Sequence, residues 1–275
     1  MQPIFKYIPD ALNNDANYCA IEHGEGFMHI CLLDKNNKTL IAQEYFRWAL
    51  GETDLWKPTN STILNYIQEH SVVFDIYTHQ PHFTLLPQSV VENDKMDIDI
   101  LFLLTGQKNM PVITEDIDTL NLRNIYIDDG YVNTLPTTTN LSITQHFITN
   151  WLTQYSKKNN GETVIDVVFY PHYFLATVWK EGKLQLIKYI YYKTNEDILY
   201  ALLQLMQYHK LDNAQTPIHI LGAIELSSNV YQYLQQYFVH MHSIETMELW
   251  KLPNALVRKC PAHLSAPLLL SLPCA

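Results

Sequence analysis

Residues 163–190, TVIDVVFYPHYFLATVWKEGKLQLIKYI, contain three short runs of β-branched, aromatic and apolar residues. The runs span residues 163–170, 174–180 and 183–190, and tight turns separate them at 171–173 and 181–182. Short runs of this composition, bounded by Pro and Gly, predict consecutive antiparallel strands. The stretch therefore predicts a three-stranded β-meander.

A second stretch, YCAIEHGEGFMHICLLDKNNKTLIAQEYF (residues 18–46), follows the same plan about 146 positions earlier in the chain. Its runs span 18–22, 27–33 and 39–46, with turns at 23–26 and 34–38. A pattern that recurs at a fixed offset predicts a duplicated domain. We expect one subdomain over residues 1–156 and another over 157–275, joined by a loop at 157–162. Duplicated sheets of this kind usually form a cleft that holds a nucleotide.

The composition sets limits on the class of protein. The chain has 275 residues, 47% of them hydrophobic, which excludes disorder and suffices for two ordinary cores. The formal net charge of −10 repels phosphate backbones, so we expect no nucleic-acid partner. No apolar run reaches the roughly 20 residues that span a bilayer, and no signal peptide is visible. Four cysteines without CxxC spacing favour reduced thiols, so we expect a cytoplasmic protein with no membrane insertion.

The segments after each meander complete the expected fold class. In the second half, Thr194 to Asp197 predict a capping box before a helix, and a strand follows at 218–221. Ser227 or Ser228 can cap another helix. Its expected buried stripe consists of Val230, Tyr233, Leu234, Tyr237 and Phe238. The first half predicts a helix over 62–70, strands over 72–77, 83–86, 98–104 and 125–127, and a helix from Asn140 or Ser142, capped by Ser142 and Gln145. The tail, 249–275, predicts an extended segment ending in an apolar piece that docks on the body. This order matches an RNase H-like core, the unit that actin-like ATPases contain in duplicate. We therefore expect an α/β protein with mixed sheets flanked by helices.

Several segments, in order, resemble one known family. They are FLATVWKEGKL (174–184), YKTNEDILY (192–200), PIHILG (217–222), FTLLP (83–87) and the C-terminal residues 269–274. Together they are similar to the bacterial domain-of-unknown-function family 3822, whose members have an actin-like ATPase fold. The resemblance implies this fold over nearly the whole chain. It implies no activity, because the family has none established.

The resemblance directs attention to the two turns that hold phosphates in actin-like ATPases. The first turn is similar to the pattern Asp-x-Gly-x-Thr, with Glu22 in place of the Asp, Gly24 retained, and Gly26 where a hydroxyl residue is expected. Two glycines permit a tight turn near a phosphate, although Glu25 adds a second negative charge. The alternative is an ordinary β-turn.

The second turn and the nucleoside landmark match the pattern less well. Residues 169–174, FYPHYF, contain no Gly, acid or hydroxyl residue of the expected kind, and Pro171 lacks a backbone donor. The nucleoside-binding Gly-Gly is here Gly222-Ala223, which can equally be a strand-to-loop turn. We therefore name Glu22, Gly24, Gly26 and Gly222 as a vestigial nucleotide cleft and expect no cofactor. ATP with magnesium is the alternative.

Other constellations predict little chemistry. The His79/His82 and His240/His242 pairs lack a third ligand at familiar spacing, so we expect surface or half-buried histidines and no metal. Carboxylates at 97, 99, 128 and 129 could hold two magnesium ions as in RNase H-type nucleases, with Glu22 as the acid of the first strand, but the composition lacks the basic substrate groove that a nuclease needs. Tyrosines 189, 191 and 192 fit a cross-strand aromatic ladder or a partner surface. Two hypotheses remain: a degenerate actin-like protein that binds an unknown protein partner, and a nucleotide-binding member with atypical phosphate loops.

Overall fold

The computed structural model describes residues 3–10, 12, 16–50, 60–90, 94–106, 110–128, 140–156, 161–244, 250–258, 260 and 262–273. The chain divides into two compact units, one of residues 1–158 with 270–275 and one of residues 159–269. The division of the sequence into subdomains 1–156 and 157–275 stays a prediction, and most of its expected boundary loop (157–160) lies outside the described residues.

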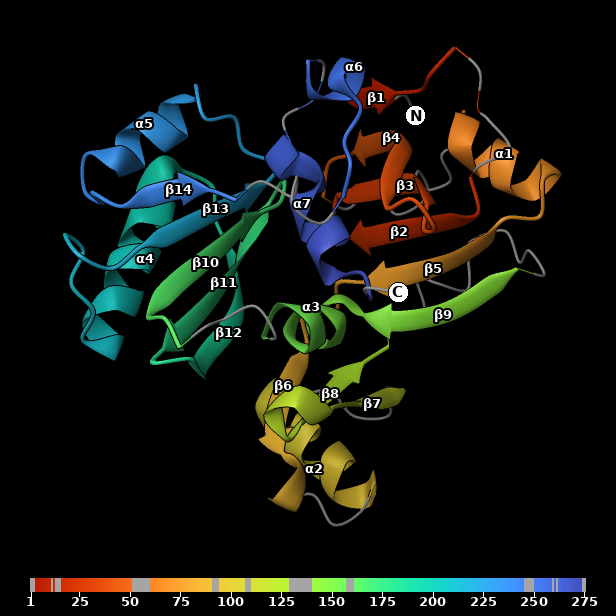
Figure 1. Cartoon of the computed structure of the whole chain (residues 1–275). Helices are drawn as coiled ribbons and strands as arrows, with labels where there is room; N and C mark the ends of the chain where they lie inside the picture. Colours follow the sequence, from red (N-terminus) through yellow and green to blue (C-terminus); the bar gives the residue numbers. More distant parts are fainter. Residues whose placement is uncertain are drawn as a thin grey trace. The chain divides into compact units, whose positions relative to one another are not determined.

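The first unit contains two sheets (Figure 1). Its strands and helices are β1 (Phe5–Tyr7), β2 (Tyr18–Gly24), β3 (Phe27–Asp34), β4 (Thr39–Arg47), α1 (Thr62–Glu69), β5 (Val73–Thr78), β6 (Phe83–Pro87), α2 (Asp94–Thr105), β7 (Val112–Ile117), β8 (Leu122–Ile127), β9 (Leu141–His146) and α3 (Phe147–Tyr155). The main sheet has the order β1-β4-β3-β2-β5-β9, and a smaller sheet has the order β6-β8-β7.

The second unit contains one sheet of order β12-β11-β10-β13-β14. Its strands and helices are β10 (Val164–Phe169), β11 (Tyr173–Lys180), β12 (Lys183–Tyr191), α4 (Asn195–His209), β13 (Ile218–Gly222), α5 (Asn229–Gln235), β14 (Met241–Ser243), α6 (Asn254–Val257) and α7 (Ala262–Ser271), the last of which ends in residues grouped with the first unit. The order of strands in this sheet is the same as that of β4-β3-β2-β5-β9 in the first sheet.

The predicted meanders are confirmed, and their registers coincide. Strands β2–β4 and β10–β12 are antiparallel, and the next strands, β5 and β13, join β2 and β10 in parallel. Each meander carries one register shift, between Leu32 and Leu33 in β3 and between Val178 and Trp179 in β11. These two positions are 146 residues apart, the offset that the sequence repeat predicts. Each unit is therefore a copy of the same RNase H-like core.

The two copies differ in the segment that joins β5 to β9 in the first unit and β13 to β14 in the second. In the second unit this segment contains α5. In the first unit it contains the small sheet of β6, β7 and β8 together with α2. The first unit thus carries an inserted subdomain at the place where the second has a short helix.

One face of each meander packs on a helix through an apolar core. In the first unit Ile21, Ile30 and Phe46 lie in a cluster with Ile63 and Ile67 of α1. In the second, residues of β10, β11 and β13 form a cluster with Ile198, Leu202 and Met206 of α4. Helix α4 begins with the predicted capping box, in which the Thr194 side chain accepts from the N–H of Asp197 and the Asp197 side chain from that of Thr194. The predicted α5 cap is Ser228, although Tyr237 lies beyond the helix and is 40% exposed, not inward.

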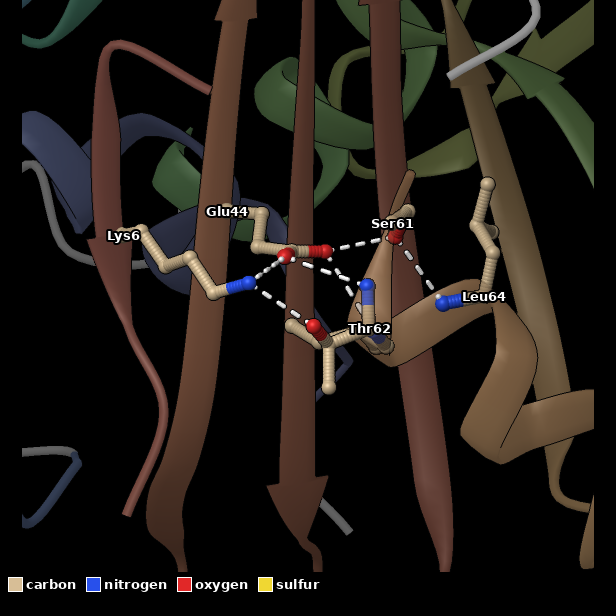
Figure 2. Close-up of polar contacts among 6 residues, drawn as sticks. Lys6, Glu44, Ser61, Thr62 and Leu64 are labelled. Carbon is tan, nitrogen blue, oxygen red and sulfur yellow. Dashed lines mark hydrogen bonds and ion pairs between the residues drawn. The ribbon is translucent and has the colours of Figure 1, made fainter. Parts of the chain in front are cut away.

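Helix α1 begins at a buried carboxylate that the neighbouring strand supplies (Figure 2). Glu44 of β4 accepts from the Ser61 hydroxyl at 2.5 Å and from the backbone N–H groups of Thr62 and Ile63 at 3.2 and 3.3 Å. The Lys6 ammonium of β1 lies 3.1 Å from the same carboxylate. Because the first N–H groups of a helix lack intrahelical partners, this anion is well placed to fix where α1 starts.

Three predicted elements are wrong. Residues 98–104 lie in helix α2, because a short apolar run does not distinguish a buried strand from a helix. Residues 141–146 form strand β9, which pairs in parallel with β5, so Ser142 caps no helix and α3 begins only at Phe147. The tail is helical in α6 and α7, with Pro267 inside α7, although its docking is confirmed because Leu264, Leu268, Leu269, Leu270 and Leu272 are buried.

Candidate functional site

The first predicted phosphate turn is a tight connection between β2 and β3. Gly24 ends β2, and Gly26 adopts a positive φ of 81°, a conformation that favours glycine. Glu25 at the tip is exposed. The carbonyl of Gly26 accepts from the N–H of Trp48 at 2.9 Å, and the Trp48 ring stacks on His23. The positive φ of the turn accounts for glycine at position 26.

Glu22 does not point into this turn. Its side chain lies on the sheet face opposite α1 and is buried, with 1% of the residue exposed. One carboxylate oxygen lies 2.9 Å from Nε2 of His79, and the other lies 3.9 Å from Nδ1 of His29. His29 in turn contacts the side-chain oxygen of Gln43 at 3.2 Å. The acid that takes the place of the motif's Asp is therefore engaged by buried histidines.

The histidines around Glu22 are held neutral by burial. Burial lowers the pKa of His79 well below its usual range, and it lowers the pKa of His29 although Glu22 acts in the opposite direction. Burial also lowers the pKa of His23 to about 4, with a further contribution from His79. The His79 ring stacks on Phe147 of α3 at 4.4 Å between ring centroids. Glu22 therefore lies in a buried hydrogen-bonded cluster with neutral histidines.

The second predicted phosphate turn is filled by aromatic side chains. The rings of Tyr170 and Tyr173 lie 5.1 Å apart, and Tyr173 also contacts Tyr189 and Tyr191 at 5.2 and 5.5 Å. The N–H of Tyr170 donates to the carbonyl of Tyr173 at 2.9 Å, and Pro171 has no N–H. The tyrosine ladder expected from the sequence is confirmed on the face that carries Tyr189 and Tyr191. Two backbone positions of this turn, 170 and 171, therefore offer no N–H to a phosphate.

Gly222, the fourth predicted residue, belongs to the second unit and has a backbone explanation. It ends β13 beside the end of β10, at a positive φ of 85°. A Cβ atom at this position would lie 2.3 Å from the carbonyl oxygen of Phe169. The N–H of Ala223 donates to the same oxygen at 2.8 Å. Close approach of two strands therefore requires glycine here without any ligand.

A layer of buried polar groups was missed by the sequence predictions. In the first unit the hydroxyl of Tyr18 donates to Asp75, and that of Tyr77 donates to the same carboxylate oxygen at 3.3 Å. Burial raises the pKa of Tyr18 and of Tyr77, so both phenols keep their protons. In the second unit Asp166 accepts from Nε1 of Trp179 at 3.0 Å and contacts Nδ1 of His219 at 2.9 Å.

Asp75 and Asp166 lie at the same register position in the two repeated sheets. Asp75 is paired in register with Ala20, and His219 with Asp166. The offset of 146 places Ala20 on Asp166, so each sheet keeps one acid on the same pair of parallel strands. The feature that the two sheets share is a buried, hydrogen-bonded acid between the paired parallel strands.

The remaining constellations do not form sites in the described parts of the chain. Asp99 is exposed on helix α2, so it is not a strand carboxylate, and Asp129 lies outside the described residues. His240, His242 and His82 are exposed, whereas His79 is buried, contrary to expectation. No group of three or more metal-ligating side chains occurs among the residues that the structure describes. Cys19, Cys31 and Cys260 are buried, and Cys274 is not described.

Two copies of an RNase H-like core in one chain define an actin-like ATPase fold. The chain belongs to the family described as "Protein of unknown function (DUF3822)", whose sequence profile matches residues 10–241. No curated protein matches it. Over the stretches that the structure describes, no helix has the length and apolar character to cross a membrane.

Two solved structures are similar over nearly their whole length. One is a protein of Bacteroides thetaiotaomicron with an actin-like ATPase fold and unknown function, at a TM-score of 0.67 and 14% identity, covering 89% of this chain and 96% of that chain. The other is the PilM-PilN type IV pilus biogenesis complex, at a TM-score of 0.61 and 8% identity, covering 94% of this chain and 98% of that chain. At these identities the similarity establishes the fold alone.

Proposed function

We propose that this protein is a non-catalytic, cytoplasmic member of the actin-like fold that acts by binding another protein. The observation that supports this most is the second turn, where Pro171 has no N–H and the N–H of Tyr170 is bonded to Tyr173. Catalysis of phosphoryl transfer in this fold depends on backbone donors and a metal-orienting acid near the phosphates. The acid of the first turn, Glu22, is engaged by His79.

A role in protein binding is supported by the fold and by the charge of the chain. The PilM-PilN structure shows a protein of similar fold in a complex with a protein partner. The net charge of −10 disfavours nucleic acid as the partner. The alternative, a nucleotide-binding member with atypical loops, is favoured by one observation: Gly24 and Gly26 still form a tight turn after β2.

Isothermal titration calorimetry with Mg-ATP separates the two functions. We expect no binding tighter than about 1 mM, which corresponds to roughly −4 kcal/mol. Micromolar binding by the full chain would overturn the proposal. In that case Glu22→Gln should abolish the binding if the first turn holds the nucleotide. Glu69→Gln, an exposed carboxylate at the end of α1, is the matched control and should leave it unchanged.

A further inference from the structure

The two repeated sheets end differently at one edge. In the first sheet β1 pairs antiparallel with β4, in the register Phe5 with Tyr45, Lys6 with Glu44 and Tyr7 with Gln43. In the second sheet the strand equivalent to β4 is β12, and in the described part of the chain no further strand pairs with it. An edge strand presents a row of backbone donors and acceptors that can pair with an added strand.

The register of the repeat identifies which part of β12 corresponds to the position covered by β1. Glu44 pairs with Ile30 in the first meander, and Lys188 pairs with Ala176 in the second. Ile30 and Ala176 are 146 residues apart, so Lys188 stands where the first unit has Glu44. A strand added like β1 would therefore run along residues 187–189.

The charges at the two edges are reversed. At the first edge the strand that is added supplies a cation, Lys6, opposite the anion Glu44 at 3.1 Å. At the second edge the receiving strand itself carries the cation, because Lys188 is exposed, as is Lys183 at the start of the strand. Opposite charges on paired strands stabilise the pairing and like charges destabilise it. The complement to this edge is a strand with an acidic residue opposite Lys188.

We propose that the β12 edge binds an extended segment of a partner protein, antiparallel to β12, with an Asp or Glu side chain facing Lys188. This inference rests on the proposed function and names the chemistry of the partner. A second copy of the chain fits poorly, because its β1 would place Lys6 opposite Lys188 and its β12 would bring another lysine-bearing strand to the edge. In strand addition the main chain supplies affinity and the alternate side chains supply specificity.

Two peptides test the edge with the full-length protein. Both have the sequence of residues 2–10 and a fluorescent label, and one carries Lys6→Glu. By fluorescence anisotropy we expect the Lys6→Glu peptide to bind about three- to tenfold more tightly than the native peptide. The amide protons of β12 should become protected from hydrogen exchange on binding. Displacement of β1 from its own edge cannot explain this preference, because Glu44 would repel the Lys6→Glu peptide.

A charge reversal in the protein completes the test. Lys188→Glu should invert the preference between the two peptides, whereas the control Lys183→Glu, at the far end of β12, should keep it. The inference fails if neither peptide binds at 1 mM, or if Lys188→Glu leaves the preference unchanged while the variant stays folded by circular dichroism. If the protein binds Mg-ATP tightly and Lys188→Glu still inverts the peptide preference, the proposed non-catalytic function is refuted, whereas the proposed binding of a strand to the β12 edge stands.

Discussion

Replacing Glu44 by alanine should destabilise the protein by about 3–5 kcal/mol, the usual cost of removing one partner from a buried charged network. The carboxylate is fully buried and accepts three hydrogen bonds at the start of α1. Hydrogen bonds to a charged acceptor contribute about 1.5–3 kcal/mol each and an anion at a helix N-terminus about 0.3–1 kcal/mol, and these contributions are not additive within one network. Lys6 is 41% exposed at its side chain, so its ion pair contributes at most about 1 kcal/mol. Most of the loss should therefore come from the helix donors.

Urea unfolding followed by circular dichroism measures this effect. Glu44→Gln keeps the size of the side chain but not its charge, and should cost less than Glu44→Ala. Lys6→Met should cost at most about 1 kcal/mol. Glu69→Ala, an exposed residue at the other end of α1, should change the free energy of unfolding by no more than about 0.5 kcal/mol. If Glu44→Ala lies within about 1 kcal/mol of the unmodified protein, the carboxylate does not determine the start of α1 as argued from Figure 2.

Three further perturbations have defined outcomes. The free energy of unfolding should fall as pH falls below about 6.5, because burial lowers the pKa of His23 to about 4 and that of His146 to about 3, so the unfolded chain binds these protons first. His146→Gln should make the urea midpoint depend less on pH. If the midpoints of the variant and the unmodified protein fall equally with pH, this reasoning is refuted. Gly222→Ala should cost about 2–4 kcal/mol in the same assay, because its Cβ would clash with the carbonyl of Phe169 at positive φ, and a loss below about 1 kcal/mol would contradict the clash. Deleting residues 263–275 should make the protein insoluble or markedly lower its melting temperature, because each buried leucine contributes about 1.5–3 kcal/mol before ordering costs. If the truncated protein stays soluble with an unchanged melting temperature, the tail is not part of the packed core.

The sequence was most informative where local and long-range signals agree. Turn residues and β-branched runs predict both meanders, and the capping box at Thr194 predicts the start of α4. The signals conflict at 141–146, where Ser142 and Gln145 imitate a capping box. There the parallel pairing with β5 decides the structure, and Ile143 is 49% exposed on the resulting strand. Pairing with a distant strand overrides a local helix signal because it satisfies the backbone of the whole segment.

The surroundings of the candidate site were beyond sequence reasoning for a different reason. Alternation along a strand separates two faces but does not reveal whether the second face is covered. The sequence pattern therefore leaves open whether Glu22 and Asp75 are solvated, whereas in the structure both are buried and Phe147 of α3 stacks on His79. The positions of Glu22, Gly24 and Gly26 at one turn were foreseeable. Which neighbours occupy the Glu22 carboxylate depends on β3 and on the segment after β5, which only the fold brings together.

The matching register shifts in β3 and β11 have a bearing on the history of the chain. Up to the shift, the two meanders align at an offset of 146, and after the hairpin that follows, Glu44 and Lys188 align at an offset of 144. The two-residue difference falls in the hairpin, which has four residues at 35–38 and two at 181–182. An irregularity copied at the same position, beside a turn that changed length, indicates descent of both halves from one ancestral meander that already contained it. Later lengthening or shortening was confined to the exposed turn, while the strand pairing on either side was kept.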